Sequence, residues 1–279
     1  MDSSYLLSVM TFVYALASML YIAAWVFKRD IVGSIGSGVV ILGFVGSTAG
    51  LIMRWIESYQ LQIGHAPLSN LYESLVFFSW TIIGLYLYVE FRYKTRAFGA
   101  FAASLAFLAL AYASLNPDIN SRIQPLLPAL KSNWLIAHVF TCFIGYAAFA
   151  IAFGMSIVYL VKQSDRDGKA DFLGRFPDLK TLDELTYQLI IFGFLFLTIG
   201  IITGSVWANS AWGRYWGWDP KETWSLITWL IYATLLHARL MRGWQGSRIA
   251  FFSLAGFCAV LFTYFGVNYL PGLHSYGAS

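Results

Sequence analysis

Eight stretches of mostly apolar residues, separated by short polar connections, run through this chain of 279 residues. A helix needs about 20 mostly apolar residues to cross the hydrocarbon core of a membrane, and each stretch is close to that length. The chain is 58% hydrophobic and 11% charged, whereas a soluble domain is about one quarter charged. The sequence therefore predicts an all-α polytopic membrane protein with one transmembrane domain over residues 1–279. The predicted spans are 5–27, 31–53, 71–91, 97–115, 134–161, 185–206, 222–240 and 249–269.

The basic residues are divided unequally between the two sets of alternate connections. Thirteen of the 18 Lys and Arg residues follow the first, third, fifth and seventh predicted spans. Since cytoplasmic connections are enriched in Lys and Arg, that set is predicted to be cytoplasmic. Both termini, the connections 54–70 and 116–133, and the segment 207–224 are then expected on the outer side, with short outer helices over the membrane. The longest connection, 162–184, carries mixed charges and is expected to hold a short surface helix.

The sequence argues against two classes of function. The basic residues lie in short connections and do not form one broad face, so nucleic acid is not expected as a partner. Cys142 and Cys258 lie inside apolar runs, and the chain has no CxxC motif. Both cysteines are interpreted as packing residues, and thiol–disulfide exchange by this chain is not expected.

The most unusual segment is WGRYWGWDPKETW, which runs from Trp212 to Trp224. Six of the 11 tryptophans lie between positions 207 and 229, and Gly213 and Gly217 lie among them. An aromatic belt at the membrane surface is the alternative explanation, but it accounts poorly for such a cluster. Glycines let the backbone approach a ligand closely, and aromatic rings offer it a stacking surface. The segment is therefore predicted to bind a flat ligand.

Capping signals mark the starts of two helices. Asp219, Pro220 and Glu222 fit the N-cap, the first helical position and the capping box of a helix that enters the seventh span. Thr181 and Glu184 give a similar signal for the helix of the sixth span.

Two histidines are predicted near the tryptophan-rich segment on the outer side. His138 lies about one turn into the span 134–161, whose helix would be about 42 Å long, against about 30 Å of hydrocarbon. Its first turns can therefore stand above the lipid. His274 follows Pro271 and Gly272 in the outer tail. Neutral imidazoles are good axial ligands of haem iron, so the pair suits a six-coordinate haem, with simple surface polarity as the alternative for each.

His237 is the one histidine predicted deep inside the membrane, about 25 Å along the seventh helix if that helix starts at Pro220. An ionisable residue at such depth indicates a functional site, and a position at the inner membrane boundary is the alternative. Arg239 and Arg242 follow it closely. They either pair with haem propionates or mark the cytoplasmic boundary, and the second interpretation is favoured.

Two further patterns have structural interpretations. His65 lies in GHAPLSNLYES, where Pro67 and Asn70 are typical of a turn that leads into the third span. No ligand role is assigned to His65. Gly46 and Gly50 form a GxxxG pattern in the second span, which indicates close packing of two helices.

The stretch WGRYWGWDPKETWSLITWLIYATLLHARL resembles the WWD domain of haem-handling membrane proteins, and it is most similar to the CcsA/ResC branch of cytochrome c biogenesis system II. The stretch RWIESYQLQIGHAPLSNLYES is similar to the same branch. The resemblance covers most of the chain and marks it as one transmembrane haem-handling domain with a WWD loop at 207–224. The order of His138, the loop, His237 and His274 matches the pattern of the family.

The resemblance implies a role in cytochrome c maturation. Together with a CcsB/ResB membrane partner, such a protein carries haem to the outer face. There the vinyl groups of haem become linked by thioether bonds to the thiols of CxxCH in an apocytochrome c. The chain would then be a haem lyase subunit in a bacterial inner membrane or a plastid thylakoid membrane, with its loop on the periplasmic or lumenal side. Thioredoxin-like thiol reductants are a further partner class.

The resemblance also implies roles for individual residues. It makes His138 and His274 the outer axial ligands of the iron of haem b, and His237 an intramembrane ligand whose opposing histidine comes from the partner. It assigns no catalytic residue. The residues implied to form the haem platform are Trp212, Trp216, Trp218, Asp219 and Trp224.

Three alternative functions stay open at this point. A CcmC-like protein would load haem onto a chaperone, but eight spans and the continuation DPKETW favour the CcsA-like interpretation. A haem-b electron-transfer subunit would usually pair histidines on facing helices within the membrane, where only His237 is expected. A transporter without bound haem would be supported by helices broken at mid-membrane, and the sequence gives no strong case for them.

Overall fold

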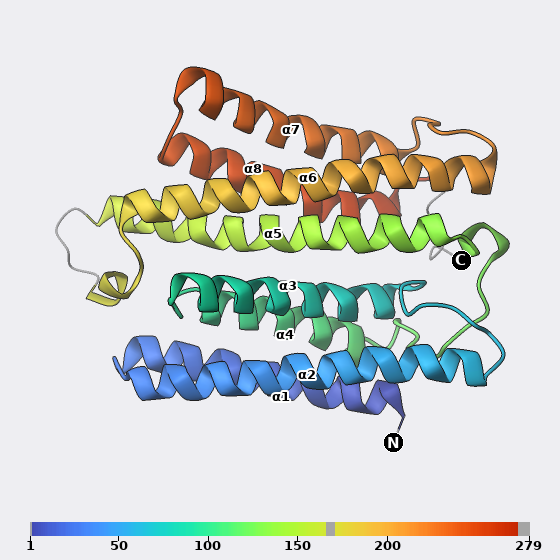
Figure 1. Cartoon of the computed structure of the whole chain (residues 1–279), viewed down its shortest axis with the longest axis horizontal. Coiled ribbons are helices and arrows are strands. Elements are labelled where there is room, and N and C mark those ends of the chain that lie inside the picture. The colour runs from blue at the N-terminus through green and yellow to red at the C-terminus, as the bar shows by residue number, and fades with distance from the viewer. Residues whose placement is uncertain (1, 166–170, 273–279) are drawn as a thin grey trace. The chain divides into compact units, whose positions relative to one another are not determined.

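The computed structural model of the chain describes residues 2–165 and 171–272, which form eight α-helices and three short 3-10 helices (Figure 1). The all-α prediction is therefore confirmed. The α-helices are α1 (Ser3–Val26), α2 (Asp30–Gln60), α3 (Leu71–Tyr93), α4 (Gly99–Leu115), α5 (Asn133–Ser164), α6 (Leu179–Trp212), α7 (Pro220–Arg242) and α8 (Ser247–Tyr264). The 3-10 helices are η1 (Pro128–Leu130), η2 (Asp171–Arg175) and η3 (Gly266–Tyr269).

Six helices in the described part of the chain are long and apolar enough to cross a membrane, namely α1, α2, α3, α5, α6 and α8. The chain is thus a polytopic membrane protein, as predicted. Helix α4 is apolar but has 17 residues. Helix α7 carries charged residues in its first and last turns. The side of the membrane on which each connection lies stays a prediction.

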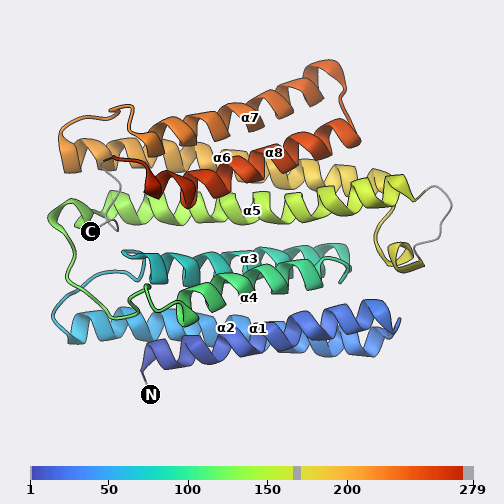
Figure 2. The same cartoon turned by 180° about the vertical axis from the view of Figure 1, so that it is seen from behind.

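The described chain divides into two compact units. Unit 1 holds α1 to α4 together with η2, and unit 2 holds α5 to α8. Within unit 1, α1 and α2 run side by side in opposite directions, and within unit 2, α5 and α6 do the same (Figures 1 and 2). The short helix η2 lies in the connection for which a surface helix was expected.

The predicted GxxxG packing in the second span is confirmed. A Cβ at Gly46 would collide with the side chain of Met10, and a Cβ at Gly50 would lie 2.6 Å from Leu7 Cδ2. Both neighbours belong to α1. Glycine at these two positions therefore lets α1 and α2 approach closely, which supplies the packing contacts that stabilise helix pairs in lipid.

Several helices end away from the predicted span boundaries: α6 continues past 206 to Trp212, and α8 ends at Tyr264 before the predicted 269. Helix α2 continues to Gln60, past the predicted end of the span at 53, because its polar last turns find partners inside unit 1. Helix α6 begins at Leu179, two residues before Thr181, since the carboxylate of Asp178 caps it by accepting the backbone N–H of Thr181 at 2.8 Å. The capping box of Asp219 and Glu222 at the start of α7 is confirmed.

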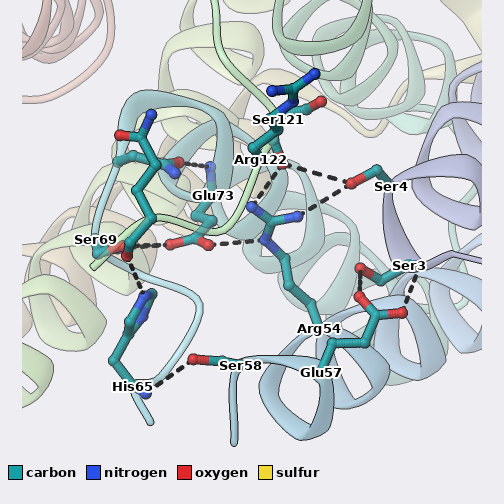
Figure 3. Close-up of polar contacts among 12 residues, drawn as sticks. Ser3, Ser4, Arg54, Glu57, Ser58, His65, Ser69, Glu73, Ser121 and Arg122 are labelled. Carbon is teal, nitrogen blue, oxygen red and sulfur yellow. Dashed lines mark hydrogen bonds and ion pairs between the residues drawn. The ribbon is translucent and has the colours of Figure 1, made fainter. Parts of the chain in front are cut away.

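A buried ion pair joins several segments at the end of unit 1 that contains the N-terminus (Figure 3). Arg54 is 1% exposed and Glu73 is 0% exposed, and Arg54 Nε lies 2.7 Å from Glu73 Oε1. Arg54 also donates to Ser4 Oγ at 3.1 Å and to the carbonyl of Ser121 at 2.8 Å. The other oxygen of Glu73 accepts the N–H and the hydroxyl of Ser69. Because both charges have several partners, the pair is compatible with full burial.

These contacts bear on the predicted arrangement of the connections. The hydrogen bonds of Arg54 bring the start of α1, the end of α2 and the connection after α4 to one end of unit 1. The distribution of Lys and Arg among the connections likewise predicts that the N-terminus, 54–70 and 116–133 lie on the same side of the membrane. Asn70 caps α3, as its turn chemistry predicted, by accepting the backbone N–H of Glu73 at 2.8 Å.

Replacing Arg54 by Gln should strongly destabilise the protein. The change leaves the Glu73 carboxylate buried without its counter-charge, which typically costs about 3–5 kcal/mol. Thermal unfolding of the purified protein in detergent would measure the loss. Arg122→Gln is the matched control, because the side chain of Arg122 is exposed. The double variant Arg54→Met/Glu73→Leu should lose less than Arg54→Gln. Equal midpoints for Arg54→Gln and Arg122→Gln would contradict this account of the pair.

Candidate functional site

Both ends of the tryptophan-rich segment are helical. Helix α6 continues through Trp212, and α7 begins at Pro220, so the non-helical part is 213–219. Gly213 ends α6 with a φ of 74°, and its N–H donates to the carbonyl of Asn209 at 2.9 Å. Glycine adopts this left-handed conformation without steric cost, which explains why the chain can leave α6 here.

One carboxylate holds the loop 213–219 in place. Glu222 Oε2 accepts the backbone N–H of Gly217 at 2.7 Å and that of Asp219 at 3.2 Å. These two residues flank Trp218, whose φ of 57° lies in the left-handed region that bulky residues rarely adopt. The Trp218 side chain is 69% exposed and contacts Trp216 edge to face, with ring centroids 5.8 Å apart. The two bonds to Glu222 therefore restrain a strained residue that presents an aromatic ring at the surface.

His138 lies in the second turn of α5, and its ring is oriented by α6. His138 Nδ1 lies 2.7 Å from the carbonyl oxygen of Gly200. A carbonyl oxygen only accepts hydrogen bonds, so Nδ1 carries the proton and the lone pair belongs to Nε2. Metal-ligating histidines commonly donate the proton of their other nitrogen to a carbonyl group in this way. The bond thus sets the tautomer in which Nε2 can ligate a metal.

The His138 ring also depends on a glycine and an aromatic ring of α6. A Cβ at Gly204 would lie 2.5 Å from His138 Nδ1, so any other residue would displace the ring. Trp207 lies nearly parallel to the imidazole, with an interplanar angle of 15° and centroids 6.1 Å apart. Trp207 in turn contacts Trp212 at 4.8 Å between centroids. Helix α6 therefore fixes both the position and the tilt of His138.

A small cavity opens beside His138. Its volume is about 60 Å³, and residues of α5, α6, α7, α8 and the loop line it. The residues that bear on its chemistry are His138, Tyr146, Trp207, Tyr215, Trp216 and Lys221. The cavity is much smaller than a haem, so a haem at His138 would also need the open faces of Tyr215 and Trp218, which are 59% and 69% exposed.

Lys221 supplies a positive charge at the cavity. It precedes the predicted span 222–240 and lies in the first turn of α7. Burial lowers the pKa of its ammonium group, and the nearby carboxylate of Asp219 opposes that shift. Asp219 itself is 7% exposed. An anionic group that entered the cavity would therefore meet a cation that is already partly removed from water.

Some predicted site residues lie outside the cavity. Trp224 contacts Phe262 of α8, with centroids 4.2 Å apart. His237 is exposed on α7, about 25 Å along the helix from the loop. Arg239 Nη1 lies 2.7 Å from Asp183 Oδ2, so this guanidinium already has a carboxylate partner. Arg242 is exposed in the last turn of α7.

The tail reaches the loop, although His274 lies outside the described residues. A Cβ at Gly272 would lie 2.5 Å from Asp219 Oδ1 and 3.1 Å from Pro220 Cδ. The last described residue of the chain therefore lies against the junction between the loop and α7.

His65 has a structural environment in unit 1. It is 6% exposed, and its Nδ1 lies 2.9 Å from the carbonyl of Ala66. Its Nε2 lies 3.1 Å from the carbonyl of Gln124, and its backbone N–H donates to Ser58 Oγ (Figure 3). Both ring nitrogens thus contact backbone carbonyls, which ties the end of α2 to the connection that precedes α5.

Sequence reasoning missed several contributors to the site. Gly200 and Gly204 repeat the GxxxG spacing that was noticed only in the second span, and this spacing was the available signal. Lys221 was not predicted as a site residue, although it lies within the motif DPKETW. Cys142 was predicted to be a packing residue and is buried, but its Sγ also lies 3.7 Å from His138 Nδ1.

Comparisons with known proteins identify the family of the chain. A family model described as "Cytochrome C assembly protein" matches residues 68–274. The "Cytochrome c biogenesis protein CcsA" of Guillardia theta is 42% identical and covers 96% of this chain and 94% of its own. Its counterpart in Gloeobacter violaceus is 38% identical, with coverages of 94% and 92%.

A solved structure shares the fold. The chain named "Cytochrome c Heme Lyase CcmF" aligns with a TM-score of 0.68 at 17% identity. The alignment covers 95% of this chain but 47% of the other, so this chain spans about half the length of that structure.

Removing the Glu222 carboxylate should release the loop. Glu222→Ala deletes both hydrogen bonds that flank Trp218, and a hydrogen bond to a charged group contributes about 1.5–3 kcal/mol. Arg214 in the loop is exposed, so trypsin cleavage after Arg214 reports on loop opening. We expect cleavage to be about tenfold faster, the factor for about 1.4 kcal/mol. Glu184→Ala, at an exposed position of α6, is the control. Equal rates in both variants would show that Glu222 does not restrain the loop.

Proposed function

The chain belongs to the cytochrome c assembly protein family as a CcsA-type protein of system II cytochrome c maturation, and from this membership we propose that it presents haem to apocytochrome c at the loop 213–219. The membership favours this role over the CcmC-like, electron-transfer and transporter alternatives. Haem b is then a substrate held at the outer membrane surface. Each thiol of CxxCH adds across a vinyl double bond, so that sulfur bonds to one vinyl carbon and the proton ends on the other.

The observation that carries this proposal is the orientation of His138. Its Nδ1 bonds to the carbonyl of Gly200 at 2.7 Å, which assigns the lone pair to Nε2. Gly204 leaves space for the His138 ring, and the Trp207 ring stacks on the imidazole. An imidazole held in one tautomer and one orientation is what an axial ligand of haem iron requires.

The surroundings of His138 match the other parts of a haem. Trp216 and Tyr215 offer flat apolar faces, which suit an aromatic macrocycle. Lys221 offers a cation in the same cavity, which suits the carboxylates at the edge of the molecule. Asp219 and Glu222 contribute by holding the loop rather than by contacting the ligand.

We assign the second outer ligand to His274. The chain passes Asp219 at Gly272, and two residues span at most about 7 Å. The tail therefore starts close to the loop, where an opposing imidazole is needed. Trp212 and Trp224 support the site from the two flanking helices, since each packs against another aromatic ring.

We propose that His237 belongs to a different haem position, shared with a CcsB/ResB-type partner. Its side chain is exposed on α7 in this chain, so a ligand from a second protein can oppose it. Arg239 is bound to Asp183, which favours a structural role at the helix end over a role with haem propionates. The route would run from His237 to the outer loop.

The contribution to the lyase reaction is positioning. Thiols held close to the vinyl groups gain rate from proximity alone, and no acid or base is assigned in this chain. The loop would lie on the periplasmic side of a bacterial inner membrane or on the lumenal side of a thylakoid membrane. Thioredoxin-like reductants would keep the CxxCH thiols reduced.

His138→Gly should lower the haem retained by the protein, because it deletes the axial ligand while leaving space for a small molecule. Soret absorbance per mole of protein, after purification together with the partner, measures the loss. Added imidazole should restore part of it, and this rescue separates a lost ligand from misfolding. Unchanged haem content in His138→Gly would contradict the ligand assignment.

Gly204→Ala should also lower haem retention, by about tenfold if the displaced ring forfeits about 1.4 kcal/mol of binding. The added Cβ would lie 2.5 Å from His138 Nδ1. Gly38→Ala in α2 is the matched control, since nothing lies within 4 Å of a Cβ there. The same absorbance measurement compares the two variants, and equal haem contents would show that Gly204 does not set the ring position.

A further inference from the structure

A second cavity lies at the opposite end of unit 1 from the Arg54 cluster, where α1 turns into α2 and α3 turns into α4. Its volume is about 300 Å³. Three basic residues from different segments line it, namely Lys94 after α3, Arg96 before α4 and Arg175 at the end of η2. Tyr21 and Trp25 of α1 supply an aromatic wall. The cavity therefore combines positive charge with rings typical of a membrane boundary.

The charges that line the cavity do not balance. Among the described residues that line it, Asp30 is the one carboxylate, against three basic side chains. Asp30 is 95% exposed and lies 3.6 Å from Arg175 Nη1. That nitrogen also donates to the carbonyl of Ala24 at 2.7 Å, so Arg175 is largely engaged within unit 1. Arg96 lies 3.3 Å from the carboxylate of Glu90, which does not line the cavity, so the excess positive charge resides on Lys94.

Lys94 and Arg96 both keep donors for a ligand. Arg96 Nε bonds to Ser37 Oγ at 3.1 Å and to Glu90 Oε1 at 3.3 Å, while its terminal nitrogens bond to no residue in the described chain. The Arg96 side chain is 47% exposed. Lys94 is exposed, and it makes no hydrogen bond or ion pair with any residue that the structure describes. Two cations thus line one cavity with unused hydrogen-bonding capacity.

Lys94 is also held in an unfavourable backbone conformation. It is the C-cap of α3 with a φ of 54°, a position that glycine commonly takes. A lysine there costs more than a glycine would, so helix capping does not explain the residue. This observation supplies a useful variant, since glycine would remove the charge and relieve the strain together.

We propose that this cavity binds the phosphate-bearing headgroup of an anionic phospholipid. A guanidinium and an ammonium group suit phosphate oxygens, and basic pockets between membrane helices bind acidic headgroups. The adjoining end of α1 favours a lipid over a soluble anion. Val26 and Phe27 are 65% and 70% exposed there, which offers apolar surface to the acyl chains of the same molecule.

The test is thermal unfolding of the purified full-length protein with added phosphatidylglycerol, phosphatidylcholine or inorganic phosphate. Phosphatidylglycerol should raise the unfolding midpoint, and the other two should not. Lys94→Gln should raise the half-saturating phosphatidylglycerol concentration about fivefold, the factor for about 1 kcal/mol per basic residue. Lys94→Gly should show the same loss with an unliganded midpoint no lower than that of the unsubstituted protein, which separates charge from folding.

Lys180→Gln is the matched control, at an exposed position near the start of α6. It should leave the response to phosphatidylglycerol unchanged. Equal stabilisation by phosphatidylcholine would overturn the proposal. An equal effect of inorganic phosphate would assign the cavity to a soluble anion and overturn the lipid. An equal loss in Lys180→Gln would show general surface attraction instead of a site.

Discussion

A peptide group without a hydrogen-bond partner in hydrocarbon costs several kcal/mol, and this cost determines the architecture of the chain. Eight helices satisfy their own backbones, so irregular structure among the described residues is confined to helix ends and connections. The polar clusters follow the same division. The Arg54–Glu73 pair, the loop 213–219 and the basic cavity near Lys94 all lie at ends of helices. These three polar clusters are therefore found near the ends of helices.

Close approach of α5 and α6 connects the fold to the site. A Cβ at Gly145 would lie 3.0 Å from the carbonyl oxygen of Gly193, which shows how near the two backbones run. The same approach continues toward the loop, where the carbonyl of Gly200 reaches the His138 imidazole. Side chains at these glycines would separate the helices and break the bond. A packing feature of membrane helices thus also sets the tautomer of a ligand.

Local signals in the sequence predicted the presence of the eight α-helices, the close packing at Gly46 and Gly50, and the start of α7. Contacts between distant segments were not predictable. Arg54 was placed in a connection because a charge ends an apolar run, and its partners lie up to 67 residues away. Gly200 lies 62 residues from His138, so nothing local indicated that the two meet. His274, which the sequence placed in the outer tail as a candidate ligand, lies beyond the described residues.

The strained backbone at Trp218 has a consequence for how the loop responds to its surroundings. A bulky residue with a φ of 57° is held there by neighbours, because its own preference is for another region. Both neighbouring N–H groups bond to one oxygen of Glu222. A hydrogen-bond donor that occupied Glu222 Oε2 would break both bonds. The backbone of Trp218 would then leave its left-handed conformation, and the exposed indole would turn with it. The conformation of the loop therefore depends on one oxygen atom.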